Sequence, residues 1–214
     1  MPGLAASSKI FERIDLPKEE FEMFFLEWMQ PLADESISTY AQRMTENIKH
    51  DNPVLIGVSF GGILVQEISK IIKVKKVIII SSVKTRNEFP LRMKWAKSVK
   101  AYKILPTGLV SNIDVISRFS FGEKVNQRIK LYDKFIAMRD KHYLDWALEA
   151  IMLWDREVAD HKVVHIHGDD DDVFPIKYIK NCVILKGGTH IMIINRYKWL
   201  NENLPKIILE ENKN

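Results

Sequence analysis

The chain has 214 residues, of which 46% are hydrophobic and 28% charged, and its 32 basic and 28 acidic side chains give a formal net charge of +4. This composition is typical of one globular domain with a sizeable core, and it excludes a disordered chain and a coiled coil. The positive charge is too small to indicate a nucleic-acid partner by itself, so none is expected, and no apolar run is long enough for stable membrane insertion.

The cellular compartment is indicated by the cysteine content. Cys182 is the single cysteine, so no disulfide can form within the chain, which fits a reducing compartment. Residues Met1–Ser8 are small but have neither a basic start nor a long apolar core, so a signal peptide is not expected. We therefore predict a cytoplasmic protein, and the sequence leaves its oligomeric state open.

The first part of the chain predicts a parallel sheet. After a loop of small residues at Met1–Ser8, three apolar stretches predict strands, at Phe21–Trp28, Val54–Ile56 and Val74–Ser81. Helices are expected between them, one capped by Ser38 or Thr39 and ending near His50, and one directly after Ser59. Alternation of strands and helices is the pattern of an α/β protein.

Residues 84–160 differ from the chain before them because they contain no convincing strand. Helical stretches are expected near residues 88–103, 111–118, 123–140 and 142–155. Strand character returns at Lys162–His167 and Asn181–Leu185, and a last helix is predicted from about Ile191 to Leu204. We interpret residues 1–83 and 161–214 as an α/β core, and residues 84–160 as a helical cap inserted into it.

The strongest chemical signal is Gly57-Val58-Ser59-Phe60-Gly61, which lies between a predicted strand and a predicted helix. In this context a G-x-S-x-G motif forms a sharp turn that exposes the serine hydroxyl, and a side chain at either glycine would collide across the turn. The helix that follows directs its positive N-terminus at the same point. A glycine-rich turn without catalytic function is the alternative interpretation.

Two later segments carry further candidates. His167-Gly168 is followed by four consecutive aspartates, Asp169–Asp172, and His190 follows a glycine pair before the last helix. The aspartates are compatible with a solvated turn or with one carboxylate that turns inward to orient a histidine. A metal site is not expected, since the ligand spacing of a calcium loop is absent.

In this order of motifs the chain resembles small α/β-hydrolase-fold proteins of the esterase-like kind. The resemblance covers essentially the whole chain and depends on the Met1–Leu4 loop, the Gly57–Gly61 turn, the His167–Pro175 loop and Gly188-Thr189-His190. It implies a three-layer α/β sandwich with a mostly parallel sheet and a helical cap. It also implies a serine hydrolase that acts on a small acyl ester or thioester and needs no cofactor or metal.

Carried over by motif, the resemblance makes Ser59 the nucleophile, His190 the general base and Asp171 the acid that orients it. Asp170 and Asp172 remain alternatives, because a run of aspartates leaves the register ambiguous. Such enzymes stabilise the oxyanion with two backbone N–H groups, here those of Phe60 and Leu4.

Members of this fold have a strand that leads into the early glycine loop and lies beside the serine strand. Met1 already stands in this loop, so we expect that strand to be absent from the sheet or its place to be filled from elsewhere. This expectation weakens the assignment of Leu4. It also supports an alternative function, a non-catalytic binding protein of the same fold with an incomplete oxyanion hole.

An apolar stripe late in the proposed cap gives candidates for substrate binding. Met152 and Trp154 belong to a stripe with Trp146, Leu148 and Ile151. Most such stripes are packed into a core. In a helical cap they can also line an acyl pocket, so Met152 and Trp154 are predicted to bind substrate.

Overall fold

A parallel β-sheet organises the chain in the computed structural model, which describes residues 1–99 and 134–210. Four strands lie side by side in chain order among these residues: β1 (Val54–Val58), β2 (Lys76–Ile80), β3 (Val163–Gly168) and β4 (Val183–Leu185). Each neighbouring pair is parallel, with Gly57 opposite Ile79 and Ile79 opposite His165. The carboxyl ends of all four strands therefore meet at one edge, where ligand sites form in sheets of this kind.

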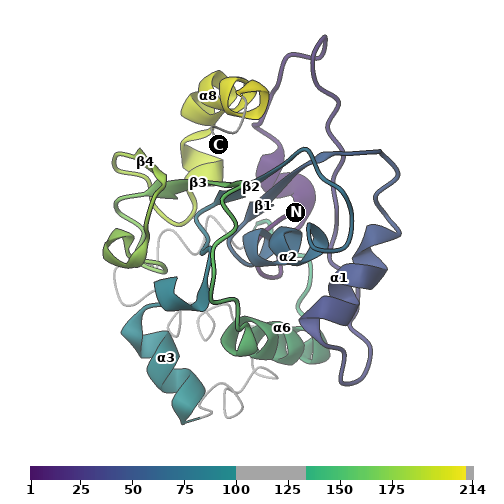
Figure 1. The fold of residues 1–214 in the computed structure, drawn as a ribbon, viewed down its shortest axis with the longest axis vertical. Helices are drawn as coiled ribbons and strands as arrows, with labels where there is room; N and C mark the ends of the chain where they lie inside the picture. The colour runs from purple at the N-terminus through teal and green to yellow at the C-terminus, as the bar shows by residue number, and fades with distance from the viewer. Residues whose placement is uncertain (100–133, 211–214) are drawn as a thin grey trace.

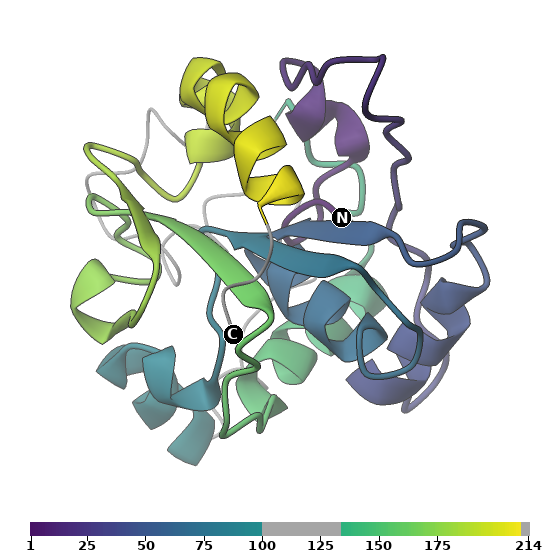
Figure 2. The same ribbon diagram turned by 45° about the horizontal axis from the view of Figure 1, so that its top comes forward.

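Helices cover both faces of this sheet, which gives three layers (Figure 2). The layer on one face holds α1 (Ile37–Thr45), α2 (Phe60–Ile68), α3 (Leu91–Ser98) and α6 (Lys141–Leu153). The layer on the other holds η1 (Ser8–Phe11), α7 (Met192–Asn195) and α8 (Tyr197–Leu209). Short turns η2 (Arg86–Glu88) and η6 (Ile176–Tyr178) connect other elements.

The sequence of β2 explains how the sheet joins these layers. All five residues of β2 are buried, as expected of a central parallel strand. Val77 and Ile79 pack into the core that contains α1, α2 and α6, whereas Ile78 and Ile80 pack into the core that contains α7 and α8. Side chains alternate between the two faces of a strand, so one apolar run serves both cores.

The sequence predicted this architecture, with some differences in detail. The strands expected near residues 54–56, 74–81, 162–167 and 181–185 are confirmed, each within a few residues. The first helix is capped by Ser36, whose Oγ accepts a hydrogen bond from the Thr39 amide, and not by Ser38 or Thr39. The last predicted helix is two helices, α7 and α8, and it extends to Leu209.

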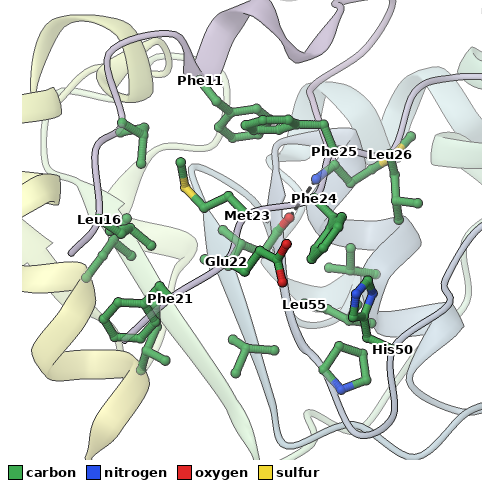
Figure 3. Close-up of a pocket in the computed structure, with 18 of the residues that line it drawn as sticks. Phe11, Leu16, Phe21, Glu22, Met23, Phe24, Phe25, Leu26, His50 and Leu55 are labelled. Atoms are coloured by element: carbon green, nitrogen blue, oxygen red, sulfur yellow. Dashed lines mark hydrogen bonds between the residues drawn. The ribbon is translucent and has the colours of Figure 1, made fainter. Parts of the chain in front are cut away.

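The strand predicted at Phe21–Trp28 is wrong. The segment is extended but belongs to no described strand. A cavity lined by residues 20–26, by Pro53 and by Val54–Ile56 of β1 lies between this segment and the sheet (Figure 3). Aromatic and β-branched residues favour a pleated surface only where a neighbouring strand supplies hydrogen bonds, and this segment has no such neighbour.

The helical cap predicted for residues 84–160 stays a prediction. Helices α3 and α6 lie within the predicted helical stretches 88–103 and 142–155, apart from the first residue of α6. The helix expected at 111–118, and most of that at 123–140, lies outside the described residues. The described part of the latter, residues 134–140, is not helical, and Ile136 instead forms an antiparallel bridge with Ala6.

Among the helices of the described ranges, none is both long and apolar enough to cross a membrane.

Candidate active site

The turn after β1 holds Ser59 in a strained backbone conformation. Its φ is 53° and its ψ is −120°, values that residues other than glycine rarely adopt. A Cβ on Gly57 would lie 2.3 Å from the Gly61 carbonyl oxygen, as expected of a tight turn. A Cβ on Gly61 would instead strike the Pro2 carbonyl oxygen at 2.3 Å, so Gly61 is required by the Met1–Leu4 loop packed against it and not by the turn itself.

Two hydrogen bonds hold this strained turn at the edge of the sheet. The Ser59 amide donates to the Ile80 carbonyl at 2.9 Å, which ties the turn to the end of β2. The hydroxyl of Ser82 donates to the Ser59 carbonyl at 2.7 Å. Ser82 was not identified from the sequence, although its place just after β2 puts it at the carboxyl edge where such partners are found.

The four consecutive aspartates are resolved by burial. Asp171 is 3% exposed, whereas Asp169, Asp170 and Asp172 are exposed. The Asp171 carboxylate accepts hydrogen bonds from the amides of Val173 (2.8 Å) and Phe174 (3.0 Å). Burial alone would raise the pKa of Asp171, but His190, His167 and the hydrogen bond from the Phe174 amide outweigh it and hold the pKa below its ordinary value. Asp171 is therefore ionised at neutral pH.

The loops after β3 and β4 are joined closely enough to bring Asp171 and His190 together. A Cβ on Gly168 would lie 2.1 Å from the Gly188 carbonyl oxygen, so only glycine permits this approach. The Asp170 amide donates to that same carbonyl at 2.9 Å, and the Gly187 amide donates to the Asp169 carboxylate at 2.6 Å. The exposed Asp169 and Asp170 thus help to position the buried Asp171.

Ser59, His190 and Asp171 form one chain of hydrogen bonds. His190 Nε2 lies 2.9 Å from Ser59 Oγ, and His190 Nδ1 lies 2.9 Å and 3.1 Å from the two carboxylate oxygens of Asp171. A neutral His190 with its proton on Nδ1 donates to Asp171 and presents the Nε2 lone pair to the serine hydroxyl. Such an arrangement can remove a proton from the hydroxyl and stabilise the resulting imidazolium.

A second histidine pair lies beneath this chain and was not assigned a function from the sequence. His167 Nε2 donates to the Phe174 carbonyl at 2.7 Å, so its Nδ1 must accept, and His165 Nε2 donates to it at 3.1 Å. Both histidines are buried and neutral in this network. Burial lowers the pKa of both, and that of His165 falls well below its usual range. The pair ties β3 to the backbone that holds Asp171.

Phe174 is a further residue of the site that the sequence did not single out. Its ring packs edge-on against His190 at 5.5 Å between centroids. Its amide donates to Asp171, and its carbonyl accepts from His167. A phenylalanine three residues after the acid is a signal that could have been read only with the fold in hand.

The backbone groups proposed for an oxyanion hole lie on two adjoining segments. Phe60 is the first residue of α2, where an amide has no carbonyl of its own helix to bond. Its ring stacks on Trp28 at 4.8 Å, and Trp28 Nε1 donates to the Gly3 carbonyl at 2.8 Å. The early loop that contains Leu4 is thereby fastened next to the start of α2. These contacts place the loop but do not test the role of the Leu4 amide.

The substrate-binding role predicted for Met152 and Trp154 stays a prediction. Trp154 is 3% exposed, and its ring N–H donates to Glu67 near the C-terminal end of α2, at the far end of that helix from Ser59. Met152, on α6, is also buried. The structure does not bring Trp154 to the three polar side chains. Three residues of the apolar stripe, Trp146, Ile151 and Trp154, belong to the core that also contains residues of α1 and α2.

The described residues were compared with the ligand sets of metal sites. Within 1–99 and 134–210, no three histidine, cysteine, aspartate or glutamate side chains gather as metal ligands.

Comparison with known proteins identifies the fold of the chain. No protein-family model matches the chain, and no similar curated protein was found. Solved structures do match. An esterase from Exiguobacterium antarcticum is 15% identical with a TM-score of 0.66, over 98% of this chain and 92% of that one. A thermophilic esterase from Thermogutta terrifontis is 10% identical with a TM-score of 0.65, over 97% and 87%.

A bromoperoxidase from Bacillus anthracis is also similar, at 18% identity and a TM-score of 0.57, over 98% of this chain and 92% of that one. These proteins share the α/β-hydrolase fold, and the chain described here has that fold too. At this level of identity the likeness establishes the fold and leaves the activity to be argued from the site.

Proposed function

We propose that the chain is a serine hydrolase that cleaves a carboxylic ester or thioester of a small molecule through an acyl-serine intermediate. The observation that carries the proposal is the continuous hydrogen-bond chain from Ser59 Oγ through His190 to Asp171, with 2.9 Å at each step. An unactivated serine hydroxyl is a poor nucleophile, and an imidazole held in this position is the group that activates it.

In the first half of the reaction, His190 Nε2 takes the hydroxyl proton as Ser59 Oγ attacks the acyl carbon. Asp171 keeps the proton of Nδ1 in place and stabilises the imidazolium. The imidazolium then gives its proton to the departing alkoxide or thiolate as that bond breaks. This step leaves Ser59 acylated and releases an alcohol or a thiol.

In the second half, His190 takes a proton from water, and the resulting hydroxide attacks the acyl-serine. Collapse of the tetrahedral intermediate releases a carboxylic acid and returns the proton to Ser59. The amides of Phe60 and Leu4 are the proposed donors to the oxyanion in both halves. Each such donor contributes about 3 kcal/mol to lowering the barrier. No cofactor takes part in this scheme.

A second candidate function is a binding protein of the same fold that no longer performs hydrolysis. The observation that favours it is that, among the described residues, Met1 alone pairs with the outer edge of β1, so the early loop joins the sheet at a single residue. The position of a Leu4 donor then depends on loop contacts such as the hydrogen bond from Trp28 Nε1 to the Gly3 carbonyl, and a poorly placed donor would leave hydrolysis slow.

A pre-steady-state assay distinguishes the two functions. With a series of p-nitrophenyl esters of increasing acyl length, the hydrolase predicts a burst of p-nitrophenol equal to the enzyme concentration. The burst should disappear in His190→Ala and persist in His161→Ala, a change at a histidine whose side chain is 78% exposed. Absence of a burst at every acyl length would support the binding protein, as would an equal burst in His190→Ala.

A further inference from the structure

The loop that contains Asp171 bonds a positively charged side chain that the proposed reaction does not use. Arg92 lies in the first turn of α3, and its Nη2 donates to two successive backbone carbonyls of this loop. The bond to the Asp172 carbonyl is 2.6 Å long, and the bond to the Val173 carbonyl is 2.8 Å long. A terminal guanidinium nitrogen carries two hydrogens, so it can bond both carbonyls at once.

The two carbonyls belong to the same peptide groups that bond the Asp171 carboxylate. The Asp172 carbonyl and the Val173 amide form one peptide group, and the Val173 carbonyl and the Phe174 amide form the next. Both groups are trans, so the C=O of each points away from its N–H. Both N–H groups donate to Oδ1 of Asp171, at 2.8 Å and 3.0 Å. Each peptide group is thus held at its oxygen by Arg92 and at its nitrogen by Asp171.

The charges of the two side chains favour this arrangement. A peptide group is negative at its oxygen and positive at its N–H, so a guanidinium on one side and a carboxylate on the other stabilise the same orientation of both groups. Hydrogen bonds in such a chain polarise and strengthen one another. Asp171 is buried and Arg92 is exposed, so a cation at the surface acts on the buried carboxylate through the backbone between them.

A ring contact joins the same two segments. Phe89, two residues before α3, is buried, and its ring centroid lies 6.0 Å from that of Phe174. Phe174 in turn packs against His190. The start of α3 is therefore attached to the Asp171 loop by a packed pair of rings as well as by Arg92.

We propose that Arg92 is a positioning residue of the hydrolase, which holds two peptide groups with their N–H directed at Asp171 and so keeps this carboxylate in place for His190. This inference rests on the proposed function, because it concerns the same site. It makes the geometry of the site depend on the place of α3, a helix of the predicted cap. The alternative is an arginine that only attaches α3 to the loop, which would stabilise the fold without a specific effect on kcat.

The first test is kinetic and uses a p-nitrophenyl ester. Arg92→Met removes the charge and the donors but keeps a long side chain. It should lower kcat about tenfold or more and change KM less than about twofold, because a displaced acid impairs the reaction more than it impairs binding. Arg92→Lys keeps a charged donor and should regain at least about threefold of that loss.

Lys94→Met is the matched control for this test. Lys94 lies on the same helix and also donates to a backbone carbonyl, but to that of Asn87, outside the Asp171 loop. Its kcat should stay within about twofold of the unmodified chain. Far-ultraviolet circular dichroism shows whether each variant is folded, and Arg92→Gln serves as the neutral variant if Arg92→Met is not.

The second test needs no hydrolysis. A histidine N–H that donates to a carboxylate, as His190 Nδ1 does to Asp171, gives a proton NMR resonance at low field. In Arg92→Met this proton should exchange with water about tenfold faster, as should the amide protons of Val173 and Phe174. The amide of Asp170, which donates to a carbonyl of the neighbouring loop, should exchange at the same rate as before.

The proposal would be overturned if the neutral variant kept kcat within about twofold, if Lys94→Met lost as much, or if Arg92→Lys were no better than the neutral variant. Unchanged exchange of the His190 proton and of the two loop amides in the folded neutral variant would overturn it too. A chain that gives no burst with any ester would refute the proposed function, whereas the exchange rates would still decide whether Arg92 positions Asp171.

Discussion

The histidine pair beneath the active site makes the stability of the fold sensitive to mild acid. His165 and His167 are 2% and 0% exposed and share one directed chain of hydrogen bonds that ends on the Phe174 carbonyl. A proton added to His165 would be buried beside His167, and burial holds the pKa of His165 well below its usual range. Protonation therefore favours the unfolded chain.

The magnitude follows from this difference in pKa. In the unfolded chain a histidine titrates near pH 6.5, and in the fold His165 stays neutral well below that value. The stability that His165 contributes is thus complete above pH 6.5 and is lost as the pH falls toward the folded pKa. Between pH 7.5 and pH 5.5 this loss is about 1.4 kcal/mol for one histidine.

His165→Gln isolates the effect, because the glutamine amide can still donate to His167 but does not titrate. Urea unfolding should show the unmodified chain losing about 1.4 kcal/mol more than His165→Gln between pH 7.5 and pH 5.5. Both chains contain the buried Glu88, whose pKa is raised by burial, so its titration cancels in the difference. His161→Gln, at an exposed histidine, should follow the unmodified chain. Equal pH dependence in His165→Gln and the unmodified chain would refute the assignment of neutral, buried histidines.

Four further substitutions, one of them a control, test the parts of the site separately. Asp171→Asn should lower kcat for an ester by about 10⁴-fold, because His190 would no longer be held with its proton on Nδ1. Asp172→Asn, at an exposed aspartate, should leave kcat within about twofold. Similar losses in both variants would contradict the choice of Asp171 by its burial. Ser82→Ala should cost about 1 kcal/mol of unfolding free energy in urea titrations, because the Ser59 carbonyl keeps the Gly62 amide but loses the Ser82 hydroxyl as a donor; no change would show that this bond is not needed. Gly61→Ala should destabilise the fold by about 1–3 kcal/mol, since the new Cβ must displace the Pro2 carbonyl; an unchanged Tm would contradict the close packing of the early loop.

The turn at Ser59 and the three polar residues of the site could be predicted, because the residues next to each of them in the sequence already indicate its place in the fold. Gly57 and Ser59 lie between a buried strand and a helix, and each of these features can be read without coordinates. Parallel strands end at one edge, so Ser59, Asp171 and His190 could be expected to meet there once their places after strands were recognised. The choice of Asp171 from four aspartates came from the resemblance, and burial now supplies an independent reason for it.

Features that depend on tertiary neighbours could not be predicted in this way. Phe21–Trp28 has the composition of a strand, but pairing requires a backbone alongside, and a cavity separates it from β1. Trp154 has the character of a pocket residue, yet its ring N–H bonds Glu67 within the core. Ser82 acts through a hydrogen bond to the Ser59 carbonyl, and Phe174 acts through its own amide and carbonyl; no side-chain pattern reveals such bonds.

The central claim, that Ser59 is a nucleophile activated by His190, is tested most directly by a fluorophosphonate probe with intact-mass detection. The proposal predicts one covalent adduct on the unmodified chain, mapped to the peptide that contains Ser59. Labelling should be abolished in Ser59→Ala and strongly slowed in His190→Ala. An adduct that persists in Ser59→Ala, or labelling of His190→Ala at the rate of the unmodified chain, would contradict the account.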